Sequence, residues 1–153
     1  MLRWTAVFAI ALMAQGASQR AHAHCQVPCG IYHDKARVQM MREDIETIDK
    51  AVKQIQALAR KRDAQSQNQL TRWVVTKEQH AERIIRTISD YFMAQKIKPV
   101  DPKDRGGHAR YSEMLLRHHA VMVAAMKCKQ NASTDPVKVL TRAVNGIAGY
   151  WKK

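Results

Sequence analysis

Two cysteines and a histidine lie close together near the start of the chain, in the sequence HCQVPCGIY at residues 24–32. The segment before them has the features of a secretory signal: a positive charge, a short apolar run and a small-residue cleavage site that ends at Ala23. Cleavage there would place a free amine, an imidazole and two thiolates within six residues. We therefore predict that residues 1–23 are a cleaved leader, and we call residues 24–32 the hook.

The processed terminus has the donors to chelate one metal ion. The amine of His24 and the amide nitrogen of Cys25 would close a five-membered ring, and that amide with its own thiolate would close another. Cys29 can add a second thiolate after the turn that Pro28 favours, which leaves the His24 imidazole for an axial position. A square plane of nitrogen and sulfur donors suits nickel(II) or copper(II), whereas zinc prefers a tetrahedron. Such electron-releasing donors also favour a trivalent state, so one-electron cycling is expected.

Other interpretations of the cysteines remain open. Cys25 and Cys29 have the spacing of a local disulfide or a thiol–disulfide redox pair in an oxidising compartment. A basic helical bundle that binds nickel or copper without turnover is a further alternative. The coincidence of His24, the cleavage site and the Pro-Cys-Gly turn favours a metal site. Cys128, in a predicted helix, is interpreted as a buried residue and not as a ligand.

Four amphipathic segments follow the hook and must position it. Their apolar residues recur at alternating steps of three and four, which indicates helices. The predicted ranges are 34–62, 69–96, 108–130 and a fourth helix that starts at Thr134-Asp135-Pro136, with a capping side chain and an early proline, and extends to Trp151. His118 and His119 are interpreted as core or interface residues. The fold class predicted is all-α, an antiparallel four-helix bundle with an N-terminal metal-binding hook.

The mature chain has the size of one domain and a strongly basic surface. Removal of 23 of the 153 residues leaves residues 24–153 as a single 130-residue domain. The formal charge of +13 becomes +11 when Arg3 and Arg20 are lost, so anions are attracted. We expect no nucleic acid as partner, because no binding motif or aromatic platform is present, and no membrane span in the mature chain. The leader predicts an exported protein, periplasmic or secreted; a cytoplasmic protein with a cleaved leader is the alternative.

The hook resembles the N-terminal nickel hook of the nickel superoxide dismutases. The pattern of that family is His-Cys, two residues, Pro-Cys-Gly, one residue and Tyr. Its fixed positions are occupied here by His24, Cys25, Pro28, Cys29, Gly30 and Tyr32. A weaker likeness extends through VVTKEQHAERI and SDYF in the second predicted helix.

The resemblance implies an enzyme that disproportionates superoxide to dioxygen and hydrogen peroxide. One nickel ion per chain would alternate between divalent and trivalent states. Its ligands would be the amine and imidazole of His24, the amide and thiolate of Cys25, and the thiolate of Cys29. The resemblance also implies a homohexamer, and a processing peptidase would have to cut between Ala23 and His24.

Further residues are implied around the metal. Tyr32 resembles the family tyrosine beside the open face of the metal, and Tyr91 resembles a second one; both would position substrate or water. Pro28 would shape the hook. The family places a glutamate early in the first helix and an arginine after KEQ, where they orient the axial imidazole. Gln39 and His80 occupy those two positions here, so the surroundings of the axial ligand are expected to differ.

Overall fold

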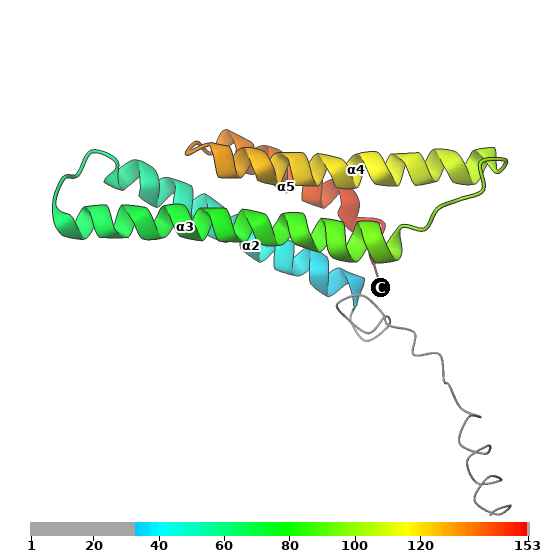
Figure 1. Cartoon of the computed structure of the whole chain (residues 1–153), viewed down its shortest axis with the longest axis horizontal. Helices are drawn as coiled ribbons and strands as arrows, with labels where there is room; N and C mark the ends of the chain where they lie inside the picture. Colours follow the sequence, from blue (N-terminus) through cyan, green and yellow to red (C-terminus); the bar gives the residue numbers. More distant parts are fainter. Residues whose placement is uncertain (1–32, 153) are drawn as a thin grey trace, which may run out of the picture.

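The computed structural model describes residues 33–152, which form a bundle of long antiparallel helices (Figure 1). The elements are α2 (Asp34–Leu58), α3 (Ala64–Arg86), the π-helix η1 (Thr87–Lys96), α4 (Arg105–Gln130) and α5 (Asp135–Ala148). Helix α2 packs on α3, α3 on α4, α4 on α5, and α5 returns to α2. The predicted all-α four-helix bundle is thus confirmed over the described part of the chain. No helix within it is apolar over a length sufficient to cross a bilayer.

The core lies along the axis of the bundle and is built from apolar side chains at helical spacing. Completely buried members from each helix include Met41, Ile48, Ile84, Val121 and Leu140. Burial of one such side chain contributes about 1.5–3 kcal/mol relative to exposure. The steps of three and four in the sequence therefore mark the residues that hold the helices together.

The first turn lies earlier in the chain than the sequence predicts, because the first helix ends before residue 62 and the second begins before residue 69. Helix α2 ends at Leu58 and α3 already begins at Ala64. The reason is Asp63, whose carboxylate accepts the backbone N–H of Ser66 at 2.8 Å and so satisfies one of the free donors at a helix start. The same hydrogen bond lowers the pKa of Asp63. Residues 64–68 are therefore helical although they carry no apolar period.

A cap also moves the start of α4 from the predicted residue 108 to Arg105. The carboxylate of Asp104 accepts the backbone N–H of Gly107 at 2.9 Å. A Cβ on Gly107 would collide with this carboxylate and lie 2.8 Å from Cγ1 of Val100. Gly106 and Gly107, which precede the predicted start, thus belong to the first turn of the helix, and at Gly107 a side chain has no room.

Helix α5 begins where the sequence predicts but lacks the predicted cap. Thr134 has φ −79° and ψ −15°, which are helical torsions and not the extended ones typical of a cap, and its side chain makes no cap hydrogen bond. Pro136 lies in the first turn as expected. The helix ends at Ala148, so Trp151 lies beyond it, yet this side chain is only 8% exposed.

Lys77 interrupts the apolar face of α3, and its side chain is buried. The residue is 4% exposed, and Nζ donates to the carbonyl oxygens of Cys128, at 2.8 Å, and Lys129. It also forms an ion pair with Glu78 at 2.8 Å. The last carbonyl oxygens of a helix have no hydrogen-bond donor within the helix, and they carry partial negative charge. An ammonium group at this position donates hydrogen bonds to them and also neutralises that charge. Lys77 thereby ties α3 to the end of α4.

The second predicted helix is not uniform, because α3 passes at Thr87 into the ten-residue π-helix η1. Each N–H of a π-helix bonds to the carbonyl five residues before it, and the last such bond joins Ile97 N–H to the Phe92 oxygen at 2.9 Å. Helices of this type are rare and are frequently found at functional sites. The apolar period of the sequence predicts a helix here but does not distinguish its type.

Candidate metal centre

Five predicted site residues lie outside the described part of the chain: His24, Cys25, Pro28, Cys29 and Tyr32. The described chain begins at His33, directly after the hook, and α2 begins at the next residue. The structure therefore shows the part of the bundle to which the hook is joined.

The carboxylate of Asp34 connects the start of α2 to η1. Its Oδ1 accepts the hydroxyl of Tyr91 at 2.6 Å and forms an ion pair with Nζ of Lys96 at 3.0 Å. The guanidinium carbon of Arg37 lies 5.2 Å from the centre of the Tyr91 ring, and Nζ of Lys96 lies 5.8 Å from it. Tyr91, which the sequence places near the metal, therefore lies at the junction between hook and bundle.

A groove of about 300 Å³ lies between α2 and the continuous helix α3–η1, next to this junction. We call it the α2–α3 groove. It is lined by Arg37, Met40, Asp44, Arg83, Arg86, Thr87, Asp90, Tyr91 and Gln95. Tyr91 thus belongs both to the junction and to the wall of the groove.

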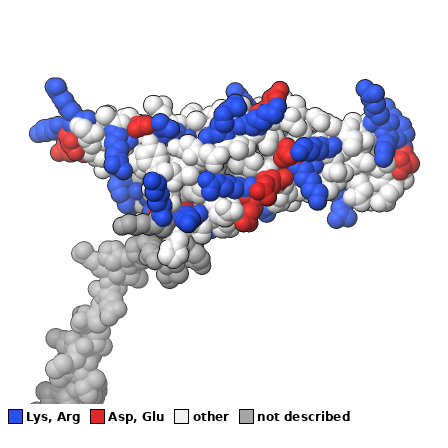
Figure 2. Space-filling view, turned by 180° about the vertical axis from the view of Figure 1, so that it is seen from behind, with Lys and Arg blue, Asp and Glu red and all other residues white. Residues whose placement is uncertain are grey.

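Basic side chains outnumber acidic ones on one face of the bundle (Figure 2) and in the lining of the groove. Figure 2 shows Lys and Arg side chains along the whole length of one face, with fewer Asp and Glu side chains between them. Three arginines and two aspartates line the α2–α3 groove. A positive surface of this kind raises the encounter rate with a small anion.

His80 belongs to a hydrogen-bonded group with Asp44 and Arg83. Nδ1 of His80 lies 2.8 Å from Oδ1 of Asp44, and the same oxygen accepts Nη2 of Arg83 at 2.6 Å. Nη2 of Arg83 is also 2.9 Å from Nε2 of His80. Asp44 is 8% exposed, and His80 is half-buried. The guanidinium group that the resemblance leads us to expect at position 80 is supplied one turn later, by Arg83.

Gln39 is exposed and does not line the α2–α3 groove. With about 3.6 residues per turn, its side chain points about 100° away from that of Met40, which does line the groove. Gln39 thus points away from the groove, whereas His80 contacts α2 through Asp44.

Cys128 and His118 are core residues, as the sequence suggests. Cys128 is 1% exposed, and burial raises the pKa of its thiol to about 11. His118 is completely buried: Nδ1 lies 2.7 Å from the carbonyl oxygen of Met114, and Nε2 accepts the indole N–H of Trp151 at 3.0 Å. Burial lowers the pKa of His118. His119 is exposed.

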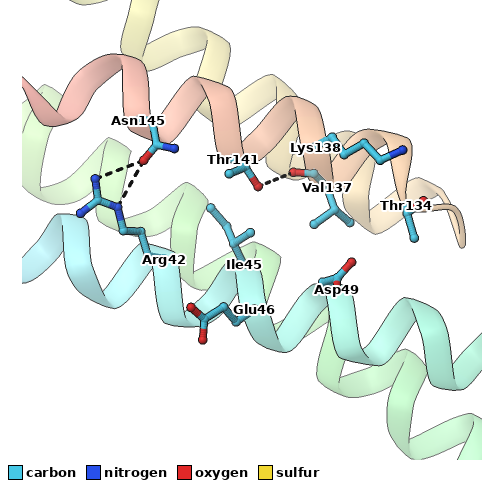
Figure 3. A pocket seen from close by; sticks show the side chains of 9 residues that line it. All are labelled: Arg42, Ile45, Glu46, Asp49, Thr134, Val137, Lys138, Thr141 and Asn145. Atoms are coloured by element: carbon cyan, nitrogen blue, oxygen red, sulfur yellow. Dashed lines mark hydrogen bonds between the residues drawn. The ribbon is translucent and has the colours of Figure 1, made fainter.

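A second groove, of about 430 Å³, lies between α2 and α5 (Figure 3). Arg42 spans it with hydrogen bonds of 3.3 and 3.1 Å to Oδ1 of Asn145, and Ile45 and Val137 face each other across its apolar part. None of its nine lining residues is a cysteine or histidine. Nowhere among residues 33–152 are three His, Cys, Asp or Glu side chains grouped as a metal site.

Sequence reasoning did not identify Asp34, Asp44, Arg83 or Lys96. Asp44 offered one signal, because it lies three residues after Met41 on the apolar face of α2, where a carboxylate needs a partner. The partners themselves come from α3 and η1. Their identity depends on how the two helices are aligned, which the spacing within one helix does not determine.

A family model described as nickel-containing superoxide dismutase matches residues 19–153. The match includes the hook and every helix described above. No curated protein and no solved structure matches the chain.

Proposed function

This chain belongs to the family of nickel-containing superoxide dismutases, and we propose that the hook binds its nickel, one ion per chain. As a member of this family the protein is an oxidoreductase that disproportionates superoxide to dioxygen and hydrogen peroxide with a nickel cofactor. The observation that carries the proposal is the uninterrupted sequence HCQVPCGIY within the matched residues.

The proposed ligands are the amine and imidazole of His24, the amide nitrogen and thiolate of Cys25, and the thiolate of Cys29. Their chelate rings and mixed nitrogen and sulfur donors suit a square-planar divalent nickel ion. When bound, nickel supplies the one-electron cycling between divalent and trivalent states. The thiolates and the deprotonated amide donate electron density and so favour the higher state.

The properties of Cys128, the third cysteine of the chain, support this ligand set. A thiolate, and not a thiol, binds a metal ion. Cys128 has a pKa of about 11 and is almost completely buried, so it is protonated at neutral pH. Cys25 and Cys29 are the other two cysteines of the chain, and a site with two thiolates has to use both.

Chain length supports the proposed roles of the tyrosines. Cys29 precedes Asp34 by five residues, so their Cα atoms are separated by no more than about 18 Å. The hydroxyl of Tyr91 is 2.6 Å from the Asp34 carboxylate, so only five residues of chain separate the residue that it contacts from Cys29. We propose that Tyr32 positions substrate beside the metal and that Tyr91 lies next to Tyr32. We also propose that Pro28 shapes the turn between the two thiolates.

We also propose that His80 would orient the imidazole of His24 when nickel is bound, with Asp44 and Arg83 holding His80 in place. Removal of a residue that hydrogen-bonds to a metal ligand, without binding the metal itself, typically lowers metal affinity or activity by about 10–100-fold. Gln39 lies on the exposed side of α2, and a role for it beside the same imidazole stays a prediction.

Processing, location and assembly complete the proposal. A peptidase would cut between Ala23 and His24, and the mature chain would be exported to the periplasm or secreted. The support for both is the signal-like leader. The support for a homohexamer is the resemblance of the hook, and light scattering of the trimmed protein in solution would test it.

The decisive experiment compares two proteins, residues 24–153 and the same chain with Ala23 retained. The extra residue converts the His24 amine into an amide, so we expect nickel uptake and superoxide decay in stopped-flow measurements only for the shorter protein. Equal circular dichroism spectra would show that both are folded. Equal activity of the longer protein would contradict the ligand set.

The same preparations distinguish the alternatives. Nickel binding without superoxide decay would indicate sequestration. Freshly purified metal-free protein in which Cys128 is the one free thiol would indicate a disulfide between Cys25 and Cys29.

A further inference from the structure

The first residue of α2 is held by two side chains from η1. The side chain of Asp34 is 15% exposed, and its Oδ1 bonds to the hydroxyl of Tyr91 and to Nζ of Lys96. In Figure 1 the start of α2 lies beside the end of the continuous helix α3–η1. Asp34 is also two residues after Tyr32, the last residue of the hook.

The π-helix explains how Tyr91 and Lys96 reach the same oxygen atom. They are five residues apart, and in an α-helix, at 100° per residue, their side chains would point about 140° away from each other. In a π-helix the hydrogen bonds join residues five apart, so these two side chains lie on the same side, one turn above the other. A second contact spans the same interval, because Nε2 of Gln95 donates to the backbone carbonyl of Asp90, five residues before it, at 2.8 Å.

We propose that Asp34, Tyr91 and Lys96 form a clamp that fixes the point and direction in which the hook leaves the bundle, and that η1 is the element that builds it. This inference rests on the proposed binding of nickel by the hook. Tyr91 is then a positioning residue for the hook, because its hydroxyl proton is engaged by Asp34 at the first residue of α2.

The composition of the clamp fits a positioning role better than a purely stabilising one. An exposed ion pair contributes only about 0–1 kcal/mol, and Asp34 would interact favourably with the start of its own helix without any partner. The clamp instead uses a charged acceptor, a hydroxyl donor and an ammonium group on one oxygen atom. Two such contacts on one atom restrict the direction of a short segment more than they add to the stability of the bundle.

The test replaces Tyr91 by Phe, which removes the hydroxyl and keeps the ring. Tyr111→Phe, at a half-buried tyrosine of α4, is the matched control. In the metal-free trimmed protein, we expect amide hydrogen exchange over residues 36–40 to accelerate roughly tenfold in Y91F and to stay unchanged in Y111F, as for the loss of one hydrogen bond to a charged acceptor. With nickel bound, the electron paramagnetic resonance spectrum of the trivalent metal should change in Y91F alone.

Variants of Asp34 extend the test. D34A should reproduce Y91F in both measurements, whereas D34N keeps an oxygen acceptor for the tyrosine hydroxyl and should restore part of the effect. If Y91F and D34A have the same exchange rates and the same spectra as the control Y111F, the proposed clamp is wrong. Failure of the wild-type trimmed protein to bind nickel would overturn the proposed ligand set, and exchange in the metal-free protein would still decide on the clamp.

Discussion

The indole N–H of Trp151 donates to Nε2 of His118 across 3.0 Å, which fastens the end of the chain to the middle of α4. Phe92 packs against both rings, with centroid distances of 4.8 Å to Trp151 and 5.5 Å to His118. His118 is therefore held in its neutral form, in which Nδ1 donates to the Met114 carbonyl and Nε2 accepts. The C-terminal residues, η1 and α4 thus share one small cluster of rings.

This arrangement predicts a loss of stability in weak acid. Burial lowers the pKa of His118, whereas the unfolded chain binds the proton near the ordinary histidine pKa of about 6.5. Below that pH the unfolded state binds more protons than the folded state, so the free energy of unfolding decreases from about pH 6.5 down to the folded pKa. The melting temperature of the metal-free protein, measured between pH 7.5 and 5, should show this decrease.

Two histidine variants provide the control for the acid effect. H118Q removes the titrating group and should be less stable at pH 7 but less dependent on pH. H119Q changes the exposed neighbour and should retain the wild-type profile. A profile of H118Q with the wild-type slope would show that another group is responsible.

Replacement of Lys77 by Met should destabilise the bundle by about 2 kcal/mol. The variant keeps the length of the side chain but leaves the carbonyls of Cys128 and Lys129 without their cation, and an unsatisfied buried group costs about 1–3 kcal/mol. Urea unfolding of the metal-free protein measures the change. K53M is the control, because Lys53 is 63% exposed in its ion pair with Asp49 and should contribute less than about 1 kcal/mol.

Asp44→Asn should impair the metal centre more than it impairs the fold. An amide in place of the buried carboxylate weakens the orientation of both His80 and Arg83, and we expect nickel affinity or superoxide decay to fall about 10–100-fold. D49N, at a more exposed aspartate of the same helix, should retain nearly full activity. Nickel titration and stopped-flow measurements of superoxide decay on both variants report the effect on the metal centre, and their unfolding curves report the effect on the fold. Equal activity of D44N and D49N would contradict the proposal that His80 orients the imidazole of His24.

Cys128 should not react in the folded protein. Its thiol is buried, and its pKa of about 11 keeps the reactive thiolate scarce at neutral pH. A disulfide reagent added to reduced, metal-free trimmed protein should therefore modify Cys25 and Cys29 quickly and Cys128 only after denaturation. Rapid modification of all three would mean that α4 opens locally far more often than its burial indicates.

The helices could be predicted from the sequence because each one carries its own period, while their ends depend on single polar contacts. Asp63 and Asp104 extend α3 and α4 toward their N-termini beyond the apolar pattern. Thr134 has the right residue type for a cap but the wrong backbone torsions. The π-helix was not predictable, because a step of five residues has no distinct apolar signature over ten residues.

The proposed site likewise has one part that could be predicted from the sequence and one part that could not. The hook could be identified from sequence because its donors are contiguous, so that their geometry follows from covalent structure. The surrounding residues come from paired helices: Asp34 meets Tyr91, and Asp44 meets His80 and Arg83, at separations of 36 to 57 residues. Family positions identified His80 and Tyr91 as candidates, but not the carboxylates that hold them.

The start of α2 and Trp151 lie at one end of the bundle, where Asp34 contacts Tyr91 and the adjacent Phe92 contacts Trp151 (Figure 1). We therefore expect an affinity tag or fusion partner attached after Lys153 to lie near the start of α2, to which the hook is joined. The opposite end offers a better handle, since the turn at residues 59–63 is exposed and separated from α2's first residue by the full length of that helix. Surface immobilisation or fluorophore attachment at this turn should leave the enzyme working.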